Sequence, residues 1–298
     1  MTNRPTGFIG IGNMGWPMAA NLVRSGRALL IHDLNADRMA SFAKEFGVAT
    51  ASSPKALGAQ TSEVITMLPD GKIVRDVVLG DADGLVHTLP DRALIIDMSS
   101  SDPVGTRELG AVLQDHGIQL VDAPVSGGVQ GAINASLTIM IGSNNANALA
   151  RARPLLSILG RRLFETGPLG SGHAMKALNN MVAAAGFAAL SEVLIVGGRF
   201  GLDQKVMIEI LNSSTGRSFN SEHTFDSEVL SRSFSAGFAL SLLAKDVRIA
   251  AALSEALELE TPLMRLTGQR WQEALAQLGS GKDFTEAFRY WEDLNADK

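Results

Sequence analysis

Short apolar runs alternate with amphipathic stretches through the first half of the chain. The runs are apolar at nearly every position and lie at 6–11, 28–32, 64–68, 94–98 and 118–121. The stretches between them carry apolar residues at helical spacing and include 14–25, 36–46 and 103–116. Strands that are apolar on both faces and separated by helices are typical of a parallel sheet covered by helices on both sides. The first half is therefore predicted to be an α/β domain.

The second half shows almost no β-like alternation. One long apolar pattern runs over 174–198, with the polar residues Lys176, Asn179 and Asn180 near its start. Other helical patterns lie at 205–211, 238–257 and 262–278. A Gly/Pro segment at 167–172 precedes the long pattern and follows a helical pattern at 145–158 and a short run at 162–166. We expect an α/β domain of residues 1–166 and an all-helical domain of residues 167–298.

Composition excludes several classes of function. The net charge of -5 and the pI near 5.6 argue against nucleic-acid binding, which needs a basic face. The absence of cysteine removes disulfides, thiolate nucleophiles and cysteine-ligated zinc. The five histidines show no metal-ligand spacing, so no metal site is expected. This composition is compatible with a reducing cytosol, and a cytoplasmic protein is the expectation.

Neither a signal peptide nor a membrane span is expected. The apolar stretch 8–22 is interrupted by glycines and by Pro17, and no small-residue cleavage site follows it. The most apolar helical candidate, 181–190, is too short to cross a bilayer. We therefore expect a protein without a membrane partner.

Glycines follow the first apolar run in a pattern suited to phosphate binding. The motif Gly10-Ile11-Gly12-Asn13-Met14-Gly15 stands between a predicted strand and a predicted helix. Gly10 permits a tight turn, Gly12 lets the backbone approach a pyrophosphate, and Gly15 lets helix and strand pack closely. The N-terminus of the following helix offers N–H groups to an anion. The motif predicts a dinucleotide-binding loop, with a glycine turn that binds no ligand as the alternative.

The residues after the second run bear on the choice of cofactor. Asp33 stands about 20 residues beyond the glycine motif, where a carboxylate that binds the ribose is expected. A carboxylate accepts hydrogen bonds from the ribose hydroxyls of NAD and repels the 2′-phosphate of NADP. The next residue is Leu34 rather than an arginine, although Arg38 lies one turn into the next helix and could reach inward. We expect NAD in preference to NADP.

A second glycine-containing motif, Asp122-Ala-Pro-Val-Ser-Gly-Gly-Val-Gln-Gly131, follows a predicted strand end. Gly127 and Gly128 can present consecutive backbone N–H groups to an anion, with the Ser126 hydroxyl as a further donor. This arrangement suits a substrate carboxylate. A plain Pro/Gly turn is an equally good interpretation of the motif by itself.

A third motif, Gly170-Ser-Gly-His-Ala-Met-Lys-Ala-Leu-Asn-Asn180, begins the long apolar pattern. Lys176 and Asn180 are one helical turn apart and share a face. A cation near a helix N-terminus opposes the helix dipole, which points to function. The same field, with partial burial, is expected to lower the pKa of Lys176 and favour the neutral amine that a general base requires. The alternative is a lysine that extends to solvent.

Other residues narrow the chemistry. Lys245, followed by Asp246, could bind an anionic substrate or cofactor, although a solvated Lys–Asp pair is the commoner arrangement. Short-chain dehydrogenases use a tyrosine four residues before a lysine, whereas the only tyrosine, Tyr290, is followed by Leu294 at that spacing. A lysine that acts as general base is the remaining candidate for the proton transfer.

The motifs together resemble the β-hydroxyacid dehydrogenase family, in order and over nearly the whole chain. The resemblance also covers Met67-Leu68-Pro69 and Asp97-Met-Ser99-Ser100. It implies a Rossmann-like domain joined by a long helix to an all-α domain, and a homodimer or homotetramer with the helical domain at the subunit contact. Leu34 departs from the arginine that NADP-preferring members often carry and favours NAD.

The resemblance also implies residue roles. Lys176 would be the catalytic lysine, with Asn180 as a substrate partner. Ser126, Gly127 and Gly128 would bind the substrate carboxylate. Met67, Leu68, Pro69 and Ser99 would line the nicotinamide side of the cofactor, and Asn179 and Lys245 would lie near the substrate, Lys245 also near the cofactor.

We therefore expect reversible hydride transfer between NAD and a small anionic 3-hydroxy acid, 3-hydroxyisobutyrate-like, or its semialdehyde. A related semialdehyde, sulfonate or imine reductase is the first alternative. The second, from another class, is a non-catalytic NAD-binding interaction protein. Such a protein would be expected to lose the lysine, so the intact Lys176, Asn179 and Asn180 favour catalysis.

Overall fold

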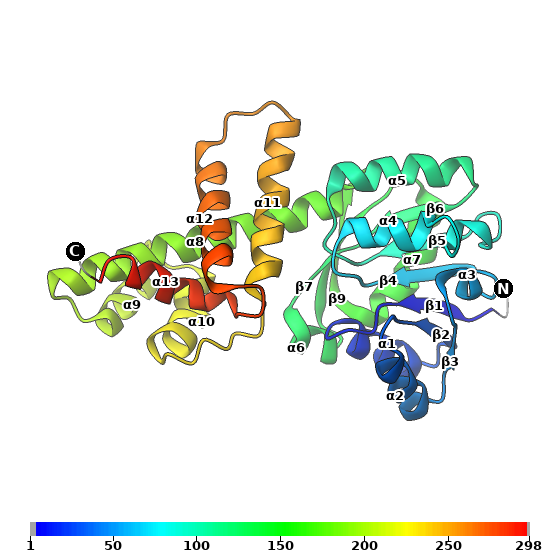
Figure 1. The fold of residues 1–298 in the computed structure, drawn as a ribbon, viewed down its shortest axis with the longest axis horizontal. Helices are drawn as coiled ribbons and strands as arrows, with labels where there is room; N and C mark the ends of the chain where they lie inside the picture. Colours follow the sequence, from blue (N-terminus) through cyan, green and yellow to red (C-terminus); the bar gives the residue numbers. More distant parts are fainter. Residues whose placement is uncertain (1–3, 297–298) are drawn as a thin grey trace. The chain divides into compact units, whose positions relative to one another are not determined.

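The computed structural model describes residues 4–296 and divides the chain into two compact units, Met1–Lys176 and Ala177–Lys298 (Figure 1). The first unit contains a sheet with strand order β3-β2-β1-β4-β5-β6-β8-β7, and β9 pairs with β8. Its strands are β1 Thr6–Ile9, β2 Leu29–His32, β3 Ala49–Thr50, β4 Glu63–Thr66, β5 Leu94–Asp97, β6 Gln119–Asp122, β7 Val125–Ser126, β8 Leu137–Gly142 and β9 Gly160–Gly167.

Helices cover both faces of this sheet, as the apolar runs predict. They are α1 Gly15–Arg24, α2 Ala36–Phe46, α3 Pro54–Gly58, α4 Gly71–Leu79, α5 Pro103–Asp115, α6 Gly128–Ile133 and α7 Ala146–Leu159, with a 3₁₀ turn at Leu85–His87. Neighbouring residues of one strand enter different cores: Phe8 packs with α1, α2 and α7, whereas Ile9 packs with α3, α4 and α5 (Figure 1). Because both faces are buried, the strands are apolar throughout.

Side-chain caps set the start of several helices. Asn35, Asp70 and Asp102 each accept a hydrogen bond from a backbone N–H in the first turn of the following helix. Such a cap satisfies one of the N–H groups that lack a partner within the helix. The pattern-based bounds of α2 are confirmed, and those of α5 differ by one residue at its end.

The sheet is not parallel throughout, which corrects the expectation. The strands from β3 to β6 run parallel, but β8 pairs antiparallel with both β6 and β7. The connection from β7 to β8 holds only the short helix α6. A parallel pairing needs a longer crossover, so the chain returns in the opposite direction.

The second unit is helical, as predicted. Its elements are α8 Ser171–Phe200, which begins in the first unit, α9 Gln204–Asn212, α10 Phe219–His223, a π-helix at Phe225–Leu230, α11 Leu240–Ala256, α12 Pro262–Leu278, a 3₁₀ turn at Phe284–Glu286 and α13 Ala287–Asp293. Its core is aromatic and contains Phe187, Phe225, Trp271, Phe288 and Trp291.

Helix α8 is longer than the pattern at 174–198 predicted. It has 30 residues, and an 18-residue window within it has a mean hydropathy of 1.8, so it is long and apolar enough to cross a membrane, which the stretch 181–190 was not. Core helices pass the same test, and Met181, Ala184, Phe187 and Leu194 of α8 are buried in the core of the second unit. One face of α8 therefore belongs to this core.

Candidate active site

The glycine loop between β1 and α1 has the predicted geometry. Gly10 has a φ of +92°, and a Cβ atom there would lie 2.3 Å from the Met67 carbonyl oxygen. A Cβ at Gly15 would lie 1.8 Å from the Gly10 carbonyl oxygen. At Gly12, by contrast, a Cβ would meet no described atom within 4 Å, so the loop is open on that side. The loop thus packs tightly against the sheet and leaves room for a phosphate at Gly12.

Asp33 is hydrogen-bonded to the glycine loop. Its Oδ2 atom accepts from the Ile11 N–H at 2.8 Å, and its Oδ1 atom accepts from the Asn35 N–H at 2.8 Å. Arg38 also reaches this loop, because its Nε atom donates to the Ile11 carbonyl. Leu34, in contrast, is 94% exposed. The structure thus places a carboxylate and a guanidinium beside the phosphate loop.

The residues predicted to line the nicotinamide side lie at the carboxyl ends of β4 and β5. The Leu68 N–H donates to Ser99 Oγ at 2.9 Å, which joins the two loops. Ser99 is fully buried, and its own N–H donates to Asp97 Oδ1 at 3.0 Å. Met67 and Leu68 are half-buried and Pro69 is exposed. Ligands of open α/β sheets bind at these strand ends.

The predicted carboxylate site lies between β7 and α6. Gly127 and Gly128 have φ angles of +132° and +61°, a region that L side chains rarely adopt. Both glycines are exposed, and Ser126 is half-buried. A Cβ at Gly128 would meet no described atom within 4 Å. The backbone therefore requires glycine here and leaves open space beside it.

Lys176 and Asn180 lie one turn apart near the start of α8. The Lys176 side chain is half-buried, and Asn180 is 7% exposed. Asn180 Nδ2 donates to Asp246 Oδ2 at 2.7 Å, and Asn180 Oδ1 accepts from Asn179 Nδ2 at 3.2 Å. Lys245 Nζ donates to Asp246 Oδ1 at 2.7 Å. Asp246 therefore holds two of the predicted site residues in place.

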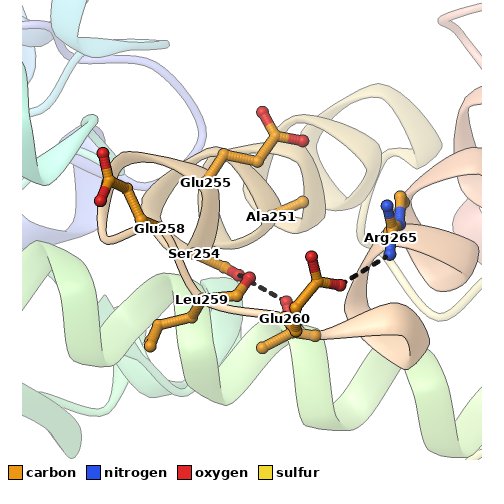
Figure 2. A pocket seen from close by; sticks show the side chains of 8 residues that line it. Ala251, Ser254, Glu255, Glu258, Leu259, Glu260 and Arg265 are labelled. Atoms are coloured by element: carbon orange, nitrogen blue, oxygen red, sulfur yellow. Dashed lines mark hydrogen bonds and ion pairs between the residues drawn. The ribbon is translucent and has the colours of Figure 1, made fainter.

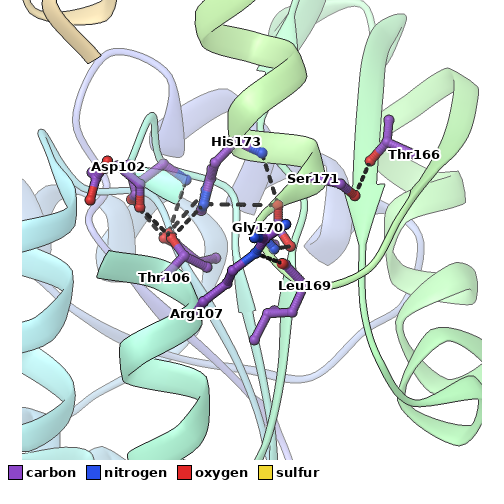
Figure 3. Close-up of polar contacts among 12 residues, drawn as sticks. Asp102, Thr106, Arg107, Thr166, Leu169, Gly170, Ser171 and His173 are labelled. Atoms are coloured by element: carbon purple, nitrogen blue, oxygen red, sulfur yellow. Dashed lines mark hydrogen bonds and ion pairs between the residues drawn. The ribbon is translucent and has the colours of Figure 1, made fainter. Parts of the chain in front are cut away.

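Sequence reasoning assigned no role to four buried polar residues next to these sites. They are Asp97, Asp122, His173 and Asp246. Three of them gather around the first turn of α8, which Figure 3 shows with Thr106, Gly170 and His173. One indication of these residues was present in the sequence, because two predicted strands end on aspartate, at Asp97 and Asp122. Their position did not predict which groups the carboxylates bind.

A surface cavity of about 360 Å³ lies elsewhere, where α11 turns into α12 (Figure 2). Three glutamates line it, and Glu260 pairs with Arg265 at 3.6 Å. None of the predicted site residues borders it. Within residues 4–296, no group of three or more His, Cys, Asp or Glu side chains could hold a metal ion.

The fold and the glycine loop indicate a dinucleotide-binding protein. A doubly covered sheet with an open Gly12, a tight Gly10 and Asp33 on the loop fits a nicotinamide dinucleotide. Two family models match the chain. The model for the NAD binding domain of 6-phosphogluconate dehydrogenase matches residues 5–167. The model for NAD-binding of NADP-dependent 3-hydroxyisobutyrate dehydrogenase matches residues 170–291.

Known relatives cover nearly the whole chain. The mitochondrial 3-hydroxyisobutyrate dehydrogenase of Rattus norvegicus is 36% identical, over 96% of this chain and 86% of its own length. The 2-(hydroxymethyl)glutarate dehydrogenase of Eubacterium barkeri is 33% identical, over 97% of this chain and 95% of its own length. The structure of Mycobacterium tuberculosis 3-hydroxyisobutyrate dehydrogenase with L-serine is 31% identical, with a TM-score of 0.87 over 97% of this chain and 99% of that one.

The chain therefore belongs to the β-hydroxyacid dehydrogenase family, as its motifs indicated. It is an NAD(P)-dependent dehydrogenase that acts on the CH–OH group of hydroxyacids. The predicted fold, a Rossmann-like domain followed by an all-α domain, is confirmed. The individual roles of the site residues stay predictions.

Proposed function

We propose that the protein oxidises a small 3-hydroxy acid whose hydroxyl is a primary alcohol, with NAD as cofactor and Lys176 as the proton-transfer residue. The observation that carries this proposal is the half-buried lysine near the start of α8, with the buried Asn180 one turn later. Family membership supports hydroxyacid chemistry, and the lysine supplies the group that such chemistry needs.

The names of the relatives support this substrate class. 3-Hydroxyisobutyrate, 2-(hydroxymethyl)glutarate and L-serine occur in those names and share a CH₂OH group one carbon away from a carboxylate. They differ in the third substituent on the middle carbon. We propose that this protein requires the shared part, and that Ser126, Gly127 and Gly128 bind the carboxylate through the Ser126 hydroxyl and backbone N–H groups.

Lys176 accepts the hydroxyl proton in the oxidative direction and returns it to the alkoxide in the reductive direction. Asn180 orients the hydroxyl, because its amide is fixed by Asp246 and Asn179. Asn179 and Lys245 contribute to substrate binding, and Lys245 also to cofactor binding. When bound, the nicotinamide ring accepts or donates the hydride.

Asp33 is the reason to propose NAD over NADP. Its carboxylate lies on the phosphate loop, where it can accept hydrogen bonds from ribose hydroxyls and repels a 2′-phosphate. Arg38 lies at the same loop, where its Nε atom donates to the Ile11 carbonyl, and the proposed preference rests on Asp33. The main-chain segment Gly10–Gly15 would hold the pyrophosphate.

The first prediction tests the lysine. Lys176→Ala should lower kcat by about 10²–10⁴-fold, the usual contribution of a positioned general base, while NAD still binds. Reduced-cofactor absorbance would be followed with 3-hydroxyisobutyrate, 2-(hydroxymethyl)glutarate and L-serine, and with a 2-hydroxy acid of similar size as the negative substrate. Lys205→Ala, an exposed lysine on α9, is the matched control.

Turnover of Lys176→Ala within a few-fold of the unaltered protein would contradict the proposed role. Equal activity on the 2-hydroxy acid would contradict the substrate class. Tight NAD binding without turnover of any hydroxyacid, semialdehyde, sulfonate or imine would favour a binding protein instead.

We also propose a homo-oligomer that forms through the helical unit. Helix α8 has, besides its core face, a second apolar stripe with positions three, four or seven residues apart. The stripe residues are Val182, Ala189, Val193, Val196 and Phe200, all exposed in the single chain. Val182, Val196 and Phe200 are 74%, 68% and 84% exposed. A contiguous apolar surface of this kind marks an interaction site, and a cytoplasmic homodimer or homotetramer accounts for it.

A further inference from the structure

Three titratable side chains are buried together at the base of α8. Asp97 ends β5, Asp122 ends β6, and His173 lies in the first turn of α8; each is at most 2% exposed. All three belong to the first unit, and the role proposed for Lys176 does not use them. Buried charges are rare unless they are paired, so the cluster requires an explanation.

Asp122 holds the turn from which α8 starts. Its Oδ1 atom accepts from the Gly170 N–H at 2.7 Å, and its Oδ2 atom accepts from the His173 N–H at 2.8 Å (Figure 3). The helix approaches so closely that a Cβ at Gly172 would lie 2.7 Å from Asp122 Oδ2. Lys176 is one turn further along the same helix, so this carboxylate fixes the backbone that carries the lysine.

Asp97 holds the loops predicted to line the cofactor. Its Oδ1 atom accepts from Thr66 Oγ1 at 2.9 Å and from the Ser99 N–H at 3.0 Å. Its Oδ2 atom accepts from Ser101 Oγ at 2.8 Å. Ser99 Oγ in turn accepts from the Leu68 N–H. This second carboxylate therefore fixes the residues on the nicotinamide side.

The protons of the His173 ring follow from counting donors. Thr106 Oγ1 donates its single proton to the Asp102 carbonyl at 2.9 Å, because a carbonyl only accepts. The 2.8 Å contact between Thr106 Oγ1 and His173 Nδ1 therefore needs a proton on Nδ1 (Figure 3). Nε2 is buried without a hydrogen-bond partner among the described residues and lies 3.6 Å from Asp97 Oδ2.

The ring lies between two carboxylates. Asp97 Oδ2 lies 3.6 Å from Nε2, and Asp122 Oδ2 lies 3.9 Å from Nδ1. Two charged residues at the start of α5 are engaged elsewhere: the N-cap residue Asp102 accepts through Oδ2 from the Gly105 N–H, and Arg107 Nε donates to the Leu169 carbonyl. Lys176 is the next cation along α8.

We propose that His173 is a positioning residue, whose ring is held by Thr106 between Asp97 and Asp122. The ring joins the carboxylate that fixes the cofactor-lining loops to the carboxylate that fixes the Lys176 turn. It thereby sets the position of the lysine amine relative to the nicotinamide side of the same unit. This inference rests on the catalytic role proposed for Lys176.

The first test observes the ring in the unaltered protein. Long-range ¹H–¹⁵N spectra, with His173→Gln used only to assign the signal, should show a proton on Nδ1, the atom that donates to Thr106 Oγ1. A ring without a proton on Nδ1 overturns the proposal. Because this measurement uses the native chain, it locates the proton even where a variant folds poorly.

The second test measures the effect of His173 on kcat and KM. His173→Gln keeps a polar side chain but removes the ring, and it should lower kcat about tenfold, since misplacement of a catalytic group by about 1 Å can cost up to about 10²-fold. The substrate KM should change less than threefold. His116→Gln, an exposed histidine at the end of α5, is the matched control and should change kcat less than twofold.

A double variant separates this inference from the proposed function. If His173 acts through Lys176, then His173→Gln should cause no further loss in a Lys176→Ala background. The same tenfold loss in both backgrounds would overturn the positioning role and leave the lysine base intact. Full turnover of Lys176→Ala alone would instead refute the proposed function.

Discussion

At the scale of single residues, Asp33 is held in place by the chain itself. The two hydrogen bonds from Ile11 and Asn35 orient its carboxylate without a ligand. Each carboxylate oxygen has two lone pairs, so both can still accept from a ribose hydroxyl. A preorganised acceptor loses little entropy on binding. This preorganisation supports the proposal that Asp33 distinguishes a ribose from a ribose phosphate.

Replacing Asp33 by asparagine should weaken NAD binding and relax the choice of cofactor. A hydrogen bond to a charged group contributes about 1.5–3 kcal/mol, so the KM for NAD should rise about 10–100-fold. The KM for NADP should fall, because the repulsion of the 2′-phosphate is removed. Both constants would be measured with saturating hydroxyacid. Asp37→Asn, an exposed acid on α2, is the control. An unchanged ratio of the two KM values would show that Asp33 does not select the cofactor.

The residues that the sequence predicted best are those whose role is local. The segment Gly10–Gly15 is continuous, and its conformation follows from glycine stereochemistry. His173, Asp97 and Asp122 lie on three different elements, and the bond from His173 to Asp122 spans 51 residues. No spacing rule connects positions that only the folded sheet brings together. The sequence therefore indicated the lysine but not the groups that position it.

At the scale of elements, long periodic patterns were predicted well and short ones were not. The bounds of α2 and α12 match the patterns at 36–46 and 262–278. Helix α4, Gly71–Leu79, and strand β8, Leu137–Gly142, were not predicted. Helix α4 carries apolar residues at helical spacing, Ile73, Val74, Val77 and Val78, but its nine residues are fewer than the window over which such a pattern is recognised. Strand β8 is a short apolar run, which periodicity alone cannot separate from a buried helix.

The turn after the π-helix, residues 231–237, is held by one carboxylate. Glu228 accepts hydrogen bonds from the Ser233 hydroxyl and from the N–H and hydroxyl of Ser235. The Ser233 hydroxyl, the strongest of these influences, lowers the pKa of Glu228. Donors that point at the charged form stabilise it relative to the acid. The carboxylate therefore stabilises the folded turn while it is ionised.

The contribution of Glu228 to the free energy of unfolding therefore depends on pH. Because the folded pKa is depressed, the term is present above the unfolded pKa of about 4.3 and is lost as the pH falls through the folded value. Glu228→Gln should thus be less stable than the unaltered chain at pH 7, and the difference in Tm should shrink below about pH 4. Glu255→Gln, an exposed glutamate on α11, is the control. A difference that stays constant with pH would contradict this account.

At the scale of the molecule, the chain consists of two units with separate cores. The sequence predicted both units with a boundary at 166/167; the two family models meet near it, at 167 and 170, and the structure divides after Lys176, inside α8. The Gly/Pro segment 167–172, which indicated the boundary, contains glycines with a packing role. Gly172 lets α8 pack against Asp122 and the Met140 carbonyl. The end of the segment is thus the anchored start of α8, and composition indicated the boundary but not this close packing.

The two faces of α8 explain why the helix is mostly apolar after Asn180. One face supplies Phe187 and Leu194 to the core of the second unit, and the other carries the exposed stripe from Val182 to Phe200. A helix that is apolar all round is buried on both sides in its working state. A second copy of the chain, as proposed above, covers the stripe without requiring a membrane, because the same surface is present on every copy.

A charge in the stripe should dissociate the oligomer. Val196→Lys places an ammonium group at a position that is 68% exposed in the single chain, so the monomer tolerates it, whereas a subunit interface would bury it. An unpaired buried charge costs several kcal/mol, and 1.4 kcal/mol is a tenfold change in a dissociation constant. Sedimentation should therefore show a lower mass for Val196→Lys than for Phe164→Lys, which adds the same charge on β9 of the first unit. An unaltered chain that sediments as a monomer, or equal masses for both variants, would show that this stripe is not the contact.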